Sequence, residues 1–267
     1  MSDNRPIGVF DSGLGGLYAT AHISHLMPRE NIVYLGDTAR VPYGTRSRET
    51  IIGYAEDDVR FLLSKDVKMI LAACGTVSSV ALDKIKESSP VPTFGIVEGA
   101  VESAMKATMS GRVAVIGTDA TIGSGVFEKM LYARGANFVI SRACPLLVPL
   151  VECGFCGRDN VVASSVCRSY LEPIKEAGVD TLILGCTHFP ILYDVISDIL
   201  CGVSLIDTGR VAAETVARYI LQSGSGADIS RGDVRYYVTD SADGFSAAAK
   251  IFVGGKKICA ETVEITK

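Results

Sequence analysis

Short runs of consecutive apolar residues recur along the chain, separated by longer segments in which apolar and polar residues are mixed. A continuous apolar run is typical of a parallel strand that is covered on both faces, whereas a strand with one wet face alternates. The pattern predicts seven strands, at residues 7–10, 31–35, 69–73, 113–116, 137–140, 181–184 and 204–206.

The segments between these runs show helical periodicity. The clearest predicted helix covers residues 48–65, and its apolar stripe consists of Ile51, Ala55, Val59 and Leu62. Ser47 is in the position of an N-cap for this helix. A second helix is predicted at residues 211–221, and it could return the chain to its first part. Strands that alternate with helices predict an α/β fold with parallel sheets.

Two parts of the chain echo each other. The strand at 69–73 runs into Cys74-Gly75-Thr76, and the strand at 181–184 runs into Gly185-Cys186-Thr187. In open α/β sheets, ligands bind beyond the carboxyl ends of the strands. We therefore expect two α/β domains, residues 1–97 together with the C-terminal segment 210–267, and residues 98–209.

Composition and charge exclude several classes of protein. The 267 residues carry a net charge of −4 with no basic stripe, so we expect no nucleic-acid partner. No apolar run approaches the roughly 18 residues of a membrane span, and the first residues do not resemble a signal peptide. We therefore expect a cytoplasmic protein with no membrane partner, whose eight cysteines are reduced thiols.

The two thiols at the strand ends suggest a chemistry. Racemisation of an amino acid needs a base on one face of Cα and an acid on the other face. A free thiol has a pKa of about 8.5, so moderate local effects can hold one thiol and one thiolate near neutral pH. Cys74 and Cys186 fit these two roles. Hydroxyls and backbone N–H groups at the other strand ends suit a ligand that carries carboxylates.

The motifs at these strand ends resemble those of the bacterial glutamate racemases of cell-wall synthesis, within the aspartate/glutamate racemase family. The matching segments are IGVFDSGLGG at 7–16, YLGDT at 34–38, PYG at 42–44 and LGCTHFP at 184–190. The resemblance implies two similar parallel-sheet domains related by pseudo-twofold symmetry, with the active site in the cleft between them. It also implies conversion of L-glutamate to D-glutamate for peptidoglycan, no cofactor, no metal and a homodimer as a possible assembly.

The resemblance assigns roles to individual positions. Cys74 and Cys186 match the catalytic thiols, and Asp11 and His188 match residues that assist them. By resemblance, Cys74 would deprotonate D-glutamate and Cys186 L-glutamate. The predicted substrate contacts are Asp11, Ser12, Pro42, Tyr43, Gly44, Gly75, Thr76, Thr118, Thr121, Cys186, Thr187 and His188. Asp37 and Glu152 match polar residues near the site, for which structural pairing and function are equally open.

One position departs from the family pattern, which has Cys-Asn-Thr where this chain has Cys74-Gly75-Thr76. Glycine removes a side-chain hydrogen bond to the substrate, worth about 1.5–3 kcal/mol if the partner is charged. Water or an accessible backbone N–H could replace it. Two alternatives therefore stay open, a racemase of a related acidic amino acid such as aspartate and a non-catalytic binding protein.

A different class of protein is suggested by a second group of cysteines. Four thiols, Cys144, Cys153, Cys156 and Cys167, fall within 24 residues. Cys153 and Cys156 form a C-x-x-C motif. Such a group could bind zinc or an iron–sulfur cluster. A second C-x-x-C at zinc-ribbon spacing is absent from the sequence, which weakens this alternative.

Overall fold

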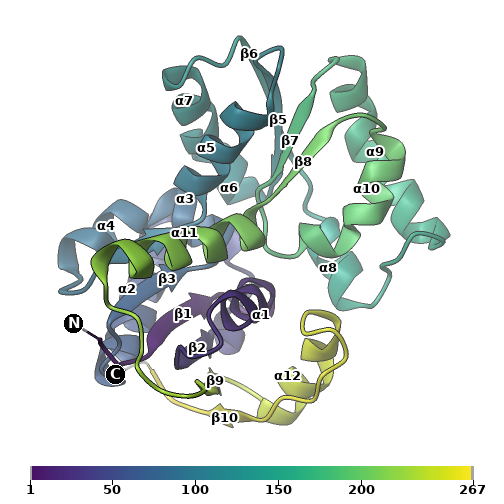
Figure 1. The fold of residues 1–267 in the computed structure, drawn as a ribbon. Coiled ribbons are helices and arrows are strands. Elements are labelled where there is room, and N and C mark those ends of the chain that lie inside the picture. Colours follow the sequence, from purple (N-terminus) through teal and green to yellow (C-terminus); the bar gives the residue numbers. More distant parts are fainter. Residues whose placement is uncertain (1, 266–267) are drawn as a thin grey trace.

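The protein is an α/β structure with two parallel sheets (Figure 1), seen in a computed structural model that describes residues 2–265. The strands are β1 (Ile7–Asp11), β2 (Ile32–Gly36), β3 (Met69–Ala72), β4 (Thr93–Gly95), β5 (Arg112–Gly117), β6 (Phe138–Ala143), β7 (Thr181–Leu184), β8 (Ser204–Asp207), β9 (Val234–Val238) and β10 (Ala260–Thr262). The seven predicted strands are confirmed, as β1, β2, β3, β5, β6, β7 and β8.

Helices fill the connections between the strands. They are α1 (Gly16–Leu26), α2 (Arg48–Ser64), α3 (Gly75–Val80), α4 (Leu82–Ser88), α5 (Val97–Ala107), α6 (Asp119–Gly123), α7 (Val126–Ala133), α8 (Leu147–Glu152), α9 (Val161–Glu176), α10 (Tyr193–Ile199), α11 (Thr208–Ser223) and α12 (Ala242–Ala248). The prediction for α2 is confirmed, because Ser47 caps it by accepting from the Thr50 N–H and its four stripe residues are buried.

The two sheets share one topology. The strand order is β10-β9-β2-β1-β3-β4 in one sheet and β6-β5-β7-β8 in the other, and every strand pair is parallel. Each sheet thus contains four consecutive strands in the spatial order second, first, third, fourth. We call the part built on the first sheet the first half, and the part built on the second sheet the second half. The echo in the sequence therefore reflects a repeated architecture.

The two halves are joined through helices. Helix α11 leaves the second sheet after β8 and packs against α1 and α5, so that it lies between the halves in Figure 1. The Tyr18 hydroxyl on α1 donates to Asp207 at the N-terminus of α11 over 2.8 Å. The chain then returns to the first sheet as β9, whose residues pair with β2. The domain limits at residues 97 and 209 stay a prediction.

Among residues 2–265, no helix combines the length and the apolar character that crossing a membrane requires. The core instead consists of apolar side chains between sheets and helices, with strand residues such as Val9, Leu71 and Ile183 fully buried. Strands buried on both faces explain why the sequence reads as continuous apolar runs.

Candidate active site

Loops from both halves enclose a cavity of about 390 Å³ at the carboxyl ends of the strands. Cys74 follows β3 and Cys186 follows β7, which are the third strands of the repeated four-strand unit. The repeat therefore places the two thiols at equivalent positions, and both line this cavity. The lining residues are Ser12, Gly13, Val41, Pro42, Tyr43, Gly44, Thr45, Cys74, Gly75, Thr76, Thr118, Asp119, Pro145, Val148, Pro149, Glu152, Cys186, Thr187 and His188.

The Cys74 thiol lies in a largely apolar setting on the first wall. Cys74 is the N-cap residue of the short helix α3, without a capping hydrogen bond from its side chain, and is only 5% exposed. Its Sγ donates to the Ser12 hydroxyl over 3.6 Å. Burial, reinforced by the nearby charge of Asp11, raises the pKa of the Cys74 thiol to about 12. Without substrate, Cys74 is therefore a protonated thiol at neutral pH.

The Cys186 thiol faces a histidine on the opposite wall. Its Sγ lies 3.9 Å from Nδ1 of His188, and Nε2 of the same ring lies 3.0 Å from Oε1 of Glu152. Burial disfavours the imidazolium, but the hydrogen bonds to Cys186 and Glu152 and the charges of Cys186 and Asp11 outweigh it and raise the pKa of His188 to about 10. The ring packs edge-on against Phe252, with 5.2 Å between the centroids. The protonated imidazole thus places a positive charge beside the Cys186 sulfur.

Asp11 lies behind the wall of the cavity. Its side chain is buried, with Oδ1 accepting from the Gly13 N–H over 2.9 Å and Oδ2 accepting from the Thr187 hydroxyl over 3.4 Å. Burial raises the pKa of Asp11, although the charge of His188 opposes the shift. Asp11 is absent from the lining, so in this structure it links the two halves and affects Cys74 through its charge.

Threonines connect the walls at a second place. The hydroxyls of Thr76 on α3 and Thr118 after β5 are 3.0 Å apart across the cavity. Thr118 caps α6 by accepting from the Thr121 N–H, and the two hydroxyls are 2.9 Å apart. Thr76 and Thr118 line the cavity, whereas Thr121 is buried beyond them and supports Thr118.

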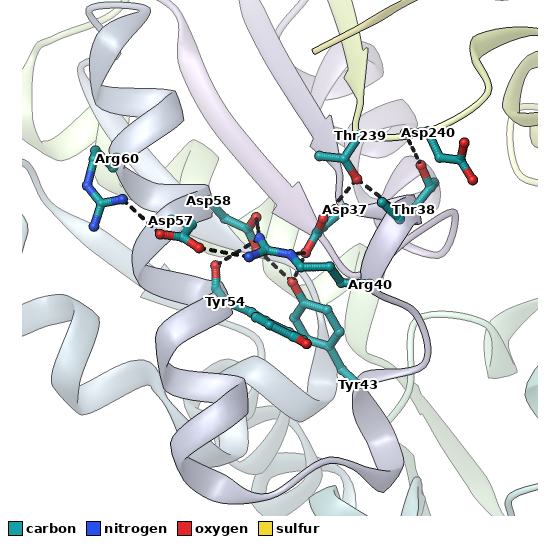
Figure 2. Close-up of polar contacts among 11 residues, drawn as sticks. Asp37, Thr38, Arg40, Tyr43, Tyr54, Asp57, Asp58, Arg60, Thr239 and Asp240 are labelled. Carbon is teal, nitrogen blue, oxygen red and sulfur yellow. Dashed lines mark hydrogen bonds and ion pairs between the residues drawn. The ribbon is translucent and has the colours of Figure 1, made fainter. Parts of the chain in front are cut away.

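A buried polar network holds the loop that carries Pro42, Tyr43 and Gly44 (Figure 2). The Tyr43 hydroxyl donates to a carboxylate oxygen of Asp37 and lies 3.2 Å from Oδ2 of Asp58. The phenol thus points away from the cavity, so that Tyr43 offers its backbone and ring edge to a ligand. Burial, followed by the charges of Asp58 and Asp37, raises the pKa of Tyr43 and keeps it a donor.

Arg40 binds the acidic groups of this network. Its guanidinium contacts Asp37 at 2.5 Å, Asp57 at 2.8 Å and Asp58 at 3.2 Å. Burial and the charge of Asp37 raise the pKa of Asp58 well above its usual range. Asp37 also accepts from Thr239 at the end of β9. Asp37 is paired with Arg40 and lies outside the cavity lining, whereas Glu152 lies within it.

Sequence reasoning missed part of the second wall. Pro145, Val148 and Pro149 follow β6, and Asp119 follows β5. The signal that could have found them is the strand-end rule itself, because β6 was a predicted strand. Its carboxyl end was misplaced, since the strand runs on through Ser141 and Arg142 to residue 143.

The four cysteines of the C-x-x-C region do not come together at one site. Cys144 and Cys167 are buried in the second half, Cys153 is exposed and Cys156 is half-buried. Within residues 2–265, no three His, Cys, Asp or Glu side chains come together in a way that could hold a metal ion. The structure therefore gives no support to the zinc or cluster alternative.

The fold and the cavity define a two-sheet α/β protein that presents two thiols to one small ligand. The family model described as Asp/Glu/Hydantoin racemase matches residues 12–216, and the chain belongs to this family.

Several relatives are similar over nearly the whole chain. The glutamate racemase of Geobacter metallireducens is 41% identical over 259 residues, covering 94% of this chain and 94% of the relative. That of Aquifex aeolicus is 42% identical, covering 93% and 94%. The crystal structure of the Francisella tularensis glutamate racemase in complex with D-glutamate has a TM-score of 0.91 at 34% identity, covering 98% of both chains. The resemblance drawn from the motifs is thus confirmed.

Proposed function

We propose that this chain interconverts L-glutamate and D-glutamate without a cofactor, by moving a proton between Cα and two opposed thiols. The observation that carries the proposal is that Cys74 and Cys186, at equivalent positions of the repeated fold, line one cavity from its two halves. The names of the relatives with about 40% identity support glutamate over aspartate. As the resemblance implies, the D-glutamate product would serve peptidoglycan synthesis.

The environments of the two thiols determine which of them acts as the base and which as the acid in the first step. The imidazolium of His188 stabilises a thiolate at Cys186, whereas burial keeps Cys74 protonated. The Cys186 thiolate removes the α-proton from one face of Cα and becomes a thiol. Cys74 returns its own proton to the other face and becomes a thiolate. The product has the opposite configuration, and the reverse reaction uses the same two groups in exchanged roles.

The remaining groups of the cavity hold the substrate. Hydroxyls from Ser12, Thr76, Thr118 and Thr187, together with the backbone of Gly44, offer hydrogen bonds to the two carboxylates of glutamate. We place the enzyme in the cytoplasm, where a reducing compartment keeps both thiols free. A homodimer stays a prediction, which sedimentation velocity tests.

The test follows optical rotation and the α-proton signal of L-glutamate in deuterium oxide, with chelator present and no cofactor added. We expect the rotation to fall to zero and the D-glutamate formed to carry deuterium at Cα. A parallel reaction with L-aspartate should be far slower. Activity on aspartate alone would move the substrate, and binding of glutamate without any exchange would identify a binding protein instead.

A further inference from the structure

Three glycines of the first half lie directly against the second half. A Cβ placed on Gly15 would come within 2.0 Å of the Thr187 hydroxyl oxygen, and one on Gly44 within 2.9 Å of the Thr118 Cβ. A Cβ on Gly75 would come within 2.2 Å of the backbone oxygen of Gly185. Because real Cβ atoms essentially never show contacts under 3.0 Å, a side chain at these positions requires something to move.

Gly75 differs from the other two glycines in what it meets. The nearest atoms to Gly15 and Gly44 belong to threonine side chains, although the Cβ of Thr118, and that of Thr187 at 2.7 Å from a Cβ on Gly15, move only when their own backbone moves. The atom facing Gly75 belongs to the main chain between β7 and Cys186, which cannot rotate away. Gly75 is the first residue of α3, so any L-residue could adopt its backbone conformation. The need for glycine therefore comes from the opposite half alone.

This backbone contact joins the two segments that carry the thiols. Gly75 follows Cys74 directly, and Gly185 precedes Cys186 directly. The separation of these two backbones therefore governs the separation of the two sulfur atoms. A reacting pair must come within about 3–3.5 Å, and a displacement of about 1 Å can cost 10²-fold in rate.

We propose that Gly75 is a positioning residue, which sets how closely the two thiol-bearing segments approach each other around the substrate. The inference rests on the proposed racemisation and extends it to a specific position. It changes the meaning of the departure from Cys-Asn-Thr. Glycine here is not merely a lost hydrogen bond, because the backbone of Gly185 lies where a side chain at residue 75 would begin, and an asparagine would require the two halves of this chain to lie further apart than they do here.

Substitutions of Gly75 distinguish a role in close approach of the two halves from the mere loss of a hydrogen bond to the substrate. If close approach is the role of Gly75, both Gly75→Ala and Gly75→Asn lower kcat/KM for glutamate by about 10²-fold. If the glycine only lacks a hydrogen bond, Gly75→Asn raises kcat/KM by about tenfold or more, and Gly75→Ala leaves it unchanged. The matched control is Gly53→Ala on α2, where an added Cβ meets no atom within 4 Å, and its kcat/KM should stay within about twofold.

A second measurement does not depend on activity. The rates at which iodoacetamide alkylates individual cysteines, mapped by mass spectrometry, report how open the cavity is. In Gly75→Ala we expect Cys74 and Cys186 to react about tenfold faster or more, because the halves are held apart. Cys167, which is fully buried in the core of the second half and away from the cavity lining, should react at the wild-type rate.

The pattern of alkylation separates the possible outcomes. Faster reaction at all three buried thiols would mean unfolding and would overturn the proposal. Unchanged reaction at Cys74 and Cys186 would overturn it too, because the added Cβ would then be accommodated without opening. An inactive wild-type protein with the expected alkylation pattern would instead reject the proposed racemisation and leave the steric role of Gly75 standing.

Discussion

The two walls of the cavity use charge in different ways. Behind the Cys74 wall, Arg40 and three aspartates form a network that holds the Tyr43 loop, and the polar neighbour of the sulfur is the Ser12 hydroxyl. On the other wall, His188 lies directly beside the Cys186 sulfur. The first wall therefore uses ion pairs to position backbone, and the second uses the His188–Glu152 pair to place a positive charge beside a sulfur atom. The same repeated fold thus gives two chemically unequal thiols.

The largest expected effect comes from removing either thiol. Cys74→Ala and Cys186→Ala should each lower racemisation by about 10²- to 10⁴-fold, because each removes a general acid or base. Exchange of the α-proton with deuterium oxide, followed for each enantiomer separately, distinguishes the roles of the two thiols. The variant that keeps only Cys74 should exchange D-glutamate, and the variant that keeps only Cys186 should exchange L-glutamate.

The matched control is Cys153→Ala, whose thiol is exposed and lies outside the cavity lining. Its activity should stay within about twofold of the wild type. If both single variants exchanged the same enantiomer, the two thiols would not act on opposite faces of Cα, and the comparison would fail.

The next effect concerns stability and isolates the first wall. Arg40→Met leaves the buried carboxyl groups of Asp37 and Asp58 without their cation, which should cost about 3–5 kcal/mol of unfolding free energy. Burial raises the pKa of Asp58 and the charge of Arg40 opposes that rise, so removing Arg40 raises this pKa further and increases the stability that the folded protein loses as pH rises. The variant should therefore be more destabilised at pH 8 than at pH 5.5, as measured by urea unfolding.

Arg60→Met is the control for this prediction. Arg60 also pairs with Asp57 (Figure 2), at 2.8 Å, but its side chain is 59% exposed. Exposed pairs contribute about 0–1 kcal/mol, so the control should unfold almost as the wild type does. Equal losses in the two variants would show that burial of the network carries no particular weight.

Much of the fold could be predicted from the sequence, because strands covered on both faces are written as uninterrupted apolar runs. The strands that were missed lack this signal. β4 and β10 are three residues long, and β10, Ala260–Thr262, is an edge strand with two exposed residues. β9 has the sequence VRYYV, in which Arg235 interrupts the apolar run, and it lies between β2 and β10 in the sheet.

The site could be predicted where chemistry follows a strand end, as at Cys74, Thr118 and Cys186. The sequence could not show which residues at the strand ends line the cavity and which are buried behind its wall. Asp11 and Thr121 follow the same rule as their neighbours, yet both are buried behind the lining. Likewise, nothing in local sequence shows that Gly75 meets Gly185, because that contact joins segments over 100 residues apart and depends on how the two halves are packed.

The smallest of these effects tests the second wall. His188→Asn keeps a polar side chain but removes the imidazolium beside Cys186, and should lower kcat/KM by about 10- to 100-fold. Because the equilibrium constant of racemisation is one, kcat/KM must fall equally in both directions, so the informative measurement is its dependence on pH.

In the wild type, the pKa of His188 is raised to about 10. The contribution of the imidazolium to kcat/KM is therefore complete at low pH and is lost as pH rises through about 10. The stability that the raised pKa provides follows the same sign, complete below about 6.5 and lost through about 10. His188→Asn should lack this alkaline decrease in both activity and unfolding free energy.

A direct NMR titration of the His188 ring in the wild type tests the raised pKa itself. A midpoint near 6.5 would mean that the second wall does not hold an imidazolium and that the two thiols are less different than the structure indicates.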